Sequence, residues 1–324
     1  MKKLIETIKN IFRIEELRNR ILYTLGLILI FRFGSFVVIP GINPTELGGL
    51  ADQVEGNGLL GLLNIFSGGA FSNASIFALG VMPYISASIV IQLLGIMVPY
   101  FQKLQKEGES GRRKINQLTR YLTIVVLLLQ GPAYIANLYS QLPDSAFVLG
   151  SNNMLFMAVA MVTLIAGTMF VMWLGEKITD KGIGNGISLL IMVGIVARLP
   201  HALLAEFNTR ITSGNLVVLV VELLIWFLVF MATIALVQAV RRIPVQYAKR
   251  IVGNKMYGGQ RQYIPLKVNA ANVMPIIFAQ ALMMIPMLFQ RFEWAQGFVA
   301  AFGNITGFWY NFTFALLVIA FTYF

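Results

Sequence analysis

Long apolar runs separated by short polar segments make up most of this chain. An α-helix needs roughly 20 mostly apolar residues to cross the hydrocarbon core of a bilayer. Runs near that length predict transmembrane helices at 21–40, 75–100, 121–139, 154–174, 183–199, 215–240, 270–289 and 308–324. The pattern therefore predicts an all-α fold, a polytopic membrane helix bundle. The last run has no polar or basic tail, which indicates a chain cut inside or just after a span.

One apolar stretch between the first two predicted spans is too short to cross a bilayer. Residues 59–66 form this stretch, and it is flanked by Gly56, Gly58, Gly61, Gly68 and Gly69. Irregular backbone survives at membrane depth only where it is buried in protein or lines a cavity. From the residues alone, two interpretations stay open. The stretch is either a movable half-helix that fills a cavity from outside or an interfacial helix on the outer surface.

The second predicted span carries small and polar residues among its aliphatic ones. Val81 and Ile85 are four residues apart and share a helix face, with Pro83 between them weakening the hydrogen-bond ladder. Ser86 and Ser88 allow close packing or form a polar seam. Taken alone, these residues also fit ordinary packing within a helix bundle.

Composition and charge exclude a water-soluble fold. Of the 324 residues, 57% are hydrophobic and 12% are charged, about half the charged fraction of an average soluble domain. So few charges cannot cover the surface of a soluble monomer, and a disordered chain would be polar. The net charge of +11 is typical of a protein that binds nucleic acid, so its distribution along the chain decides its meaning.

Basic residues gather in alternate loops. Of the 25 Lys and Arg residues, 21 lie in the N-terminal segment and in 101–120, 175–186 and 241–268, whereas three lie in the opposite loops. The positive-inside rule then places the N-terminus in the cytosol. Thirteen of these residues fall in 101–120 and 241–268, more than orientation requires. This excess favours a cytosolic partner at these two loops.

Two ionisable residues lie inside predicted spans. Arg32 and Glu222 are each about 10–12 Å below the outer end of their span, at 1.5 Å per helical residue. Charges inside a membrane are costly and are usually paired or functional. We hypothesise that Arg32 and Glu222 pair with each other; the alternative is that each reaches the interface or faces water.

Most catalytic chemistry lacks its residues here. The chain has no cysteine and one histidine, His201, and it contains no phosphate-binding GxxxxGK[ST] motif. The run GIGNGI at 182–187 lacks the third glycine of a dinucleotide fingerprint, and we interpret it as a tight turn. An intramembrane enzyme is therefore disfavoured. A secondary transporter is also disfavoured, because it would need coupling carboxylates and the predicted spans hold almost none.

Five stretches then identify a family. They are FSGGAFSNASIFALGVMPYISASIVIQLL, KEGESGRRKINQLTRY, GTMFVMWLGEKITDKGIGNGIS, YAKR and IPLKVNAANVMPIIFA. Together they resemble SecY, the family of bacterial protein-conducting channels. The resemblance implies ten transmembrane helices in two inverted halves that form a clamshell, of which this chain would supply eight. It divides the chain into an N-terminal half at 1–200, with a plug half-helix at about 57–71, and an incomplete C-terminal half at 201–324.

The resemblance also assigns residues to sites, none of them catalytic or metal-binding. The pore ring would be formed by Val81, Ile85, Ile191 and Ile277, of which Val81 is slightly smaller than the family's usual Ile. The plug would contain Leu59, Leu60, Leu62, Leu63, Ile65 and Phe66. The lateral gate, between 75–100 and 270–289, would contain Ser86, Ile89, Gln92 and Gln130. The docking tip for the ribosome and the SecA motor would contain Arg241, Arg242, Lys249 and Arg250.

The function implied by the resemblance is that of the central pore-forming subunit of the Sec translocase. Such a subunit is a passive conduit for unfolded polypeptides across the bacterial cytoplasmic membrane, and through a lateral gate into it. The implied partners are SecE, SecG, SecA, the ribosome, signal peptides, nascent chains and membrane lipid. No cofactor is implied.

Overall fold

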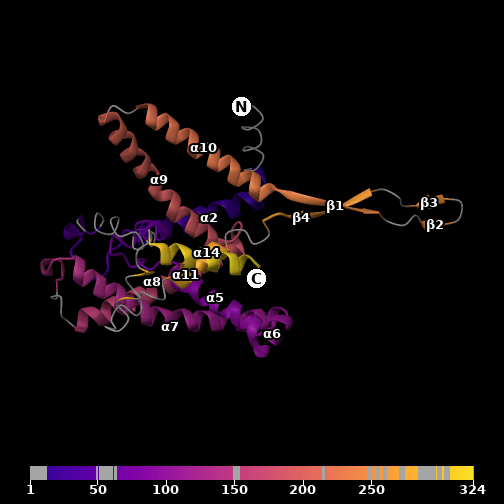
Figure 1. Ribbon diagram of the computed structural model, residues 1–324. Coiled ribbons are helices and arrows are strands. Elements are labelled where there is room, and N and C mark those ends of the chain that lie inside the picture. Colours follow the sequence, from indigo (N-terminus) through magenta and orange to yellow (C-terminus); the bar gives the residue numbers. More distant parts are fainter. Residues whose placement is uncertain are drawn as a thin grey trace. The chain divides into compact units, whose positions relative to one another are not determined.

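Helices dominate the architecture, as the apolar runs predict. The computed structural model describes residues 13–48, 50, 61, 64–148, 154–213, 216–246, 250–252, 255–257, 261–269, 274–283, 297, 301–302 and 307–323. Its α-helices, labelled in Figure 1, are α2 (Glu15–Gly34), α5 (Met82–Met97), α6 (Pro99–Lys106), α7 (Glu109–Gln141), α8 (Met154–Lys181), α9 (Gly186–Thr212), α10 (Leu216–Gln238), α11 (Met274–Met283) and α14 (Phe308–Tyr323). Two short 3₁₀ helices, η1 (Pro44–Leu47) and η2 (Asp144–Ala146), lie in connections.

Each predicted span contains one of these helices. Within the described residues, α7, α8, α9 and α10 are long and apolar enough to cross a membrane, and α5 with α6 counts as a fifth span broken at Pro99. The break has a local cause, because proline disfavours a helical residue before it and Val98 is extended at φ −108°, ψ 121°. The total of eight spans stays a prediction.

Two predicted boundaries are wrong, and prolines explain them. The segment 198–214, predicted as a loop, is helical through Thr212, because α9 accommodates Pro200 inside the helix. Conversely, α5 begins at Met82 rather than at 75, since Pro83 occupies its first turn, where a missing N–H costs little. Pro83 therefore starts this helix and does not weaken its interior, and the N–H of Ile85 still donates to the carbonyl of Val81 at 3.1 Å.

The chain forms two compact units. One comprises Met1–His201 with Phe278–Leu316, and the other comprises Ala202–Ile277 with Leu317–Phe324. The predicted halves at 1–200 and 201–324, related as an inverted repeat, stay a prediction.

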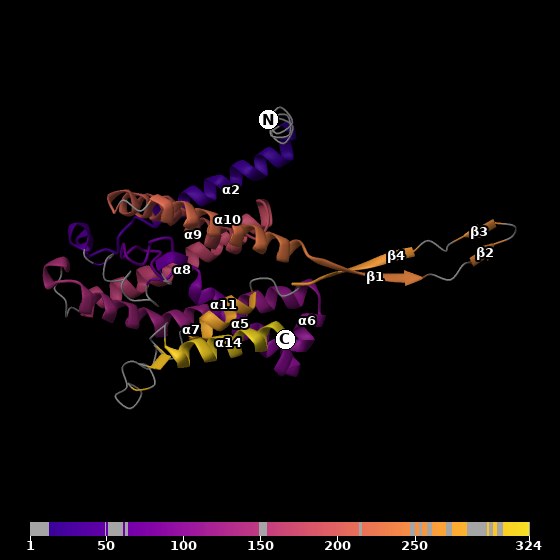
Figure 2. The ribbon, with the colours of Figure 1, turned by 45° about the horizontal axis from the view of Figure 1, so that its top comes forward.

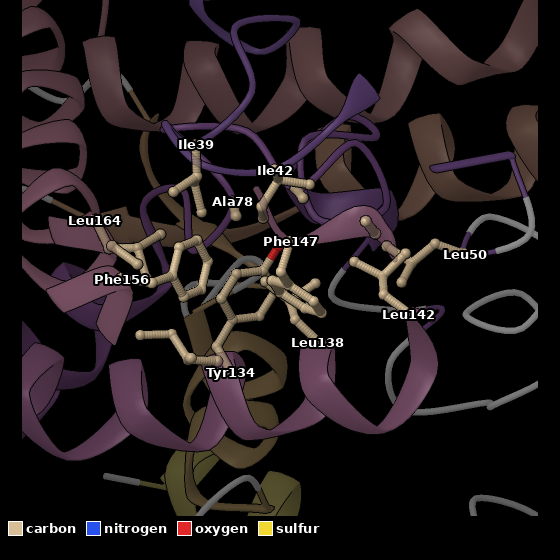
Figure 3. Close-up of a cluster of buried hydrophobic side chains, with 14 of the residues drawn as sticks. Ile39, Ile42, Leu50, Ala78, Tyr134, Leu138, Leu142, Phe147, Phe156 and Leu164 are labelled. Carbon is tan, nitrogen blue, oxygen red and sulfur yellow. The ribbon is translucent and has the colours of Figure 1, made fainter. Parts of the chain in front are cut away.

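The larger core of the first unit packs α7 against α8 and the connections beside them (Figure 3). Phe147 and Phe156 meet edge to face with ring centroids 5.3 Å apart, and Leu138 and Leu164 are each 1% exposed. Tyr134 is also buried, and its hydroxyl donates to the carbonyl of Phe71 at 3.0 Å. This bond ties the middle of α7 to the irregular segment that precedes α5.

The turn between α8 and α9 confirms the interpretation of the GIGNGI run. Gly184 has a positive φ of 71°, and Asn185 Oδ1 accepts hydrogen bonds from the N–H groups of Ile187 and Ser188 at the start of α9. A Cβ on Gly186 would collide with the carbonyl oxygen of Gly175. The glycines therefore serve a tight helix–helix turn.

A β-ribbon interrupts the second unit where the sequence analysis expected a loop. Strands β1 (Val240–Gln246) and β4 (Arg261–Lys267) pair antiparallel from Val240–Lys267 to Gln246–Arg261, and they lie side by side in Figure 2. Strands β2 (Arg250–Val252) and β3 (Lys255–Tyr257) form a second antiparallel pair. Two signals were available. One is the β-branched and aromatic residues of VRRIPVQ and RQYIPLK, although they do not alternate strictly with polar ones, and the other is Gly-Asn between Val252 and Lys255.

Gly167 of α8 packs closely against the irregular segment that precedes α5, and a substitution there tests this contact. A Cβ on Gly167 would collide with the carbonyl oxygen of Ile76, whereas one on Gly26 in α2 would have no atom within 4 Å. We predict that Gly167→Ala destabilises the protein by about 1–3 kcal/mol through overpacking. Gly26→Ala is the matched control, and the better helix propensity of alanine leaves it neutral or up to about 1 kcal/mol stabilising. Thermal unfolding in detergent, followed by tryptophan fluorescence, measures both. Equal effects of the two variants would contradict the close approach.

Candidate functional site

Three residues of the predicted pore ring lie in one apolar cluster. Val81 at the start of α5 is 7% exposed and belongs to the buried part of this cluster, and Ile85 and Ile191 pack against it half-buried. Leu27 and Phe31 of α2 and Val171, Leu174 and Ile178 of α8 complete much of the cluster. Four helices thus bring apolar side chains to one place.

The fourth predicted ring residue has a different status. Ile277 lies on α11, but its side chain is outside the described residues. The ring as a whole therefore stays a prediction, with three of its four members gathered by the fold.

The predicted plug segment is described at residue 61 and from residue 64 onward. Its helical part ends at Phe66 and not at about 71, because Gly68 and Gly69 adopt left-handed conformations with φ of 67° and 89°. Ile65 is 40% exposed and Phe66 is half-buried. The other plug residues predicted from the resemblance lie outside the described residues; they are Leu59, Leu60, Leu62 and Leu63.

Buried polar side chains hold the turn that follows. The carbonyl of Asn64 accepts from the N–H of Gly69 at 2.9 Å and from the hydroxyl of Ser67 at 3.1 Å, and Asn64 Oδ1 accepts from the N–H of Ser72 at 3.1 Å. The Ser67 hydroxyl in turn accepts from the N–H of Phe71. Asn64, Ser67 and Ser72 are each at most 4% exposed. These side chains satisfy backbone groups that a helix would otherwise pair. We call residues 64–72 the plug turn.

The plug turn packs directly on α9. A Cβ on Gly68 would lie 2.9 Å from the Cα of Gly194, and a Cβ on Gly194 would lie 2.9 Å from the carbonyl oxygen of Phe66. Glycine at both positions is therefore required for this approach. The sequence identified Gly68 only as a flexible residue flanking the plug segment. It did not identify Gly194, because nothing in the sequence around this glycine indicates that another backbone packs against it.

Arg32 contacts the same turn, and this overturns the proposed pair with Glu222. Arg32 Nη1 donates to the carbonyl oxygen of Gly68 at 2.6 Å, and its guanidinium lies 4.9 Å from the ring centroid of Phe36. Glu222 instead accepts from Arg210, 2.5 Å away, and Arg210 also bonds Glu206 at 2.7 Å. The pairing hypothesis failed because it placed Arg210 in a loop, whereas helical residues run through Thr212.

The predicted gate residues lie on two helices that pack together, α5 and α7. On α5, Ile89 is 2% exposed, the Ser86 hydroxyl donates to the carbonyl of Met82, and the Gln92 amide donates to the Ser88 hydroxyl. On α7, Gln130 is half-buried and its Oε1 accepts no hydrogen bond. The arrangement offers polar groups along a helix–helix seam, and its role as a gate stays a prediction.

The predicted docking residues fall on the β-ribbon. Arg241 and Arg242 are exposed on β1, opposite Leu266 and Pro265 of β4. Arg250 lies on β2, and Lys249 is outside the described residues. Alternation along β1 sends Arg241 and Arg242 to opposite faces of the ribbon. Each face therefore carries a basic residue.

Comparison with known proteins gives a family. The sequence model of the family SecY matches residues 75–324. The protein translocase subunit SecY of Streptomyces scabiei is 43% identical over 288 residues, which are 87% of this chain and 66% of that protein. The subunit of the same name from Escherichia coli K12 is 47% identical over 274 residues, 84% of this chain and 61% of that protein. The chain thus spans about two thirds of the length of these relatives.

Solved structures share the fold. One, described as showing that the plug domain of SecY stabilises the closed state and maintains a membrane seal, aligns with a TM-score of 0.54 at 18% identity, covering 85% of this chain and 58% of that one. Another, an idle yeast Ssh1 complex bound to the yeast 80S ribosome, aligns with a TM-score of 0.54 at 16% identity, covering 85% and 60%. At these identities the likeness concerns the fold alone.

Proposed function

Because this chain belongs to the SecY family, we propose that it forms the central pore of a protein translocase. Its homology and its apolar helices indicate a multi-pass membrane protein. In this proposal the pore is a passive conduit for unfolded polypeptides and performs no catalysis. The observation that carries it is the apolar cluster in which Val81 of α5, Ile191 of α9 and Ala70 of the plug turn pack together.

The cluster accounts for a seal against ions. Aliphatic side chains offer no hydrogen bonds to water, so a narrow apolar constriction excludes water when it is empty. It also imposes no charge preference on what passes, which suits polypeptides of any sequence. Ala70 is 0% exposed within the cluster, so the plug turn adds a second layer to the closed state.

The proposal includes a second route, through a lateral gate into lipid between the predicted spans 75–100 and 270–289. Ser86, Gln92 and Gln130, on the packed pair α5 and α7, would make one side of this gate polar enough to separate more easily than an aliphatic surface. A signal peptide that enters here shifts the closed–open balance only if it binds the open state more tightly. Apolar segments of a nascent chain then move sideways into lipid.

The cytosolic partners are proposed from charge. Basic residues on the ribbon, among them Arg241 and Arg242, would meet ribosomal RNA phosphates or acidic surfaces of SecA. The likeness to the Ssh1 channel, which is bound to a ribosome in its structure, supports the first of these. SecE and SecG are proposed as membrane partners from the family. The N-terminus and the ribbon would face the cytosol of a bacterium, with the chain in its inner membrane.

Polar substitutions in the cluster test the seal. We predict that Ile85→Ser combined with Ile191→Ser, in the full-length protein, raises resting ion conductance in planar bilayers severalfold, because hydroxyls stabilise water in the constriction. Val196→Ser is the matched control, since Val196 is on α9 but 52% exposed and outside the cluster, and it leaves conductance unchanged. Unchanged conductance in the double serine variant would refute the seal.

Charge reversal on the ribbon tests docking. We predict that Arg241→Glu with Arg242→Glu weakens binding of the full-length protein to ribosomes. The same variant lowers the salt dependence of binding by about one unit of log–log slope for each arginine that neutralises a phosphate in the complex. The control reverses Arg18 and Arg20, two exposed arginines of α2 outside both predicted partner loops. Co-sedimentation across a salt series measures both. An equally weakened control would place the docking surface elsewhere.

A further inference from the structure

Arg32 joins α2 to the plug turn by a single charged hydrogen bond. Its Nη1 lies 2.6 Å from the carbonyl oxygen of Gly68, which is 36 residues away in sequence. The side chain is half-buried in a predicted span, where a charge is costly unless a partner compensates it. In the described part of the chain, the guanidinium bonds that carbonyl and lies over the ring of Phe36, and the like charge of Arg198 also acts on it.

The carbonyl of Gly68 also gains a hydrogen-bond partner from this contact. Gly68 and Gly69 are both left-handed, so the turn at this point has left the helical hydrogen-bond ladder. A backbone carbonyl away from water needs a donor, and a guanidinium forms a stronger bond than a neutral group. Arg32 therefore bonds the carbonyl of Gly68, a group that the serine and asparagine side chains of the plug turn do not bond.

Arg32 also lies where the plug turn packs on α9. The backbones at Gly68 and Gly194 approach so closely that neither tolerates a Cβ without displacement. Arg32 lies at this same contact, because a Cβ on Gly68 would be 3.1 Å from Arg32 Nη1 and 2.9 Å from the Cα of Gly194. The hydrogen bond from α2 therefore holds Gly68 at the point where the plug turn meets α9.

We propose that Arg32 is a positioning residue that latches the plug turn in its closed seat through the carbonyl of Gly68. The proposal rests on the proposed function, in which leaving this seat opens the pore. Opening then requires the Arg32–Gly68 bond to break, while the Asn64 and Ser67 bonds inside the turn move with it.

Thiol accessibility tests the latch without reference to transport. These 324 residues contain no cysteine, and with any cysteine elsewhere in the full-length protein replaced by serine, Ala70→Cys introduces one thiol at a site that is 0% exposed in the closed turn. In the full-length protein, Arg32→Gln should raise maleimide labelling of this thiol roughly ten- to hundredfold, the change expected when a hydrogen bond to a charged group is removed. Arg32→Lys, which keeps a charged donor, should give a smaller increase.

Two controls separate a latch from a general loss of folding. Arg18→Gln removes an exposed arginine from the same helix and should leave labelling of Ala70→Cys unchanged. Ala160→Cys reports the other core, where residue 160 is also 0% exposed, and Arg32→Gln should not increase its labelling. Unchanged labelling at position 70, or an equal rise at positions 70 and 160, would overturn the latch. A selective rise at position 70 with no gain in ion conductance would instead refute the proposed function and leave the latch standing.

Discussion

Backbone polar groups inside a membrane have no water to bond, and the irregular stretch before α5 must satisfy its own within the protein. The plug turn meets this constraint with short side chains, since Asn64 and Ser67 bond its N–H and C=O groups. Farther along, the N–H of Ile39 donates to the carbonyl of Ala74, and the N–H of Ile76 donates to the carbonyl of Val37. With these bonds made, non-helical chain lies against α8 and α9, where it completes the apolar cluster.

The constraint also explains where the few charges go. A chain that is 12% charged places most of its basic residues outside the apolar runs, and three arginines in the described helices have specific partners. Arg32 bonds the plug turn, Arg210 bonds Glu222, and Arg120 of α7 bonds Glu176 of α8. The cluster around Val81 and Ile191 is left without charge, which is the property that a conduit for arbitrary polypeptides needs.

The sequence predicts more of the scaffold than of the site. Hydropathy locates the helices because a bilayer demands about 20 apolar residues whatever the neighbours are. Prolines make the predicted helix ends inaccurate. Pro83 lies in the first turn of a helix and Pro200 lies inside one, and hydropathy does not distinguish these two cases. The ribbon was missed because a basic, exposed two-stranded pair lacks the apolar face that usually marks strands. Family resemblance identified Ile85 and Ile191, which the fold brings together. The close contact between Gly68 and Gly194 and the bond from Arg32 to Gly68 depend on tertiary geometry. Neither the periodicity of the sequence nor the position of a residue within a predicted span predicts such contacts.

In the proposed function, a polypeptide crosses the membrane through the apolar cluster against which Ile85 of α5 and Ile191 of α9 pack. Site-specific photo-crosslinking with an arrested secretory chain in the full-length protein tests it most directly. A photoreactive residue at position 85 or 191 should crosslink to the arrested chain, and one at position 164, buried in the other core, should not. Crosslinks at position 164 but none at 85 or 191 would contradict the account.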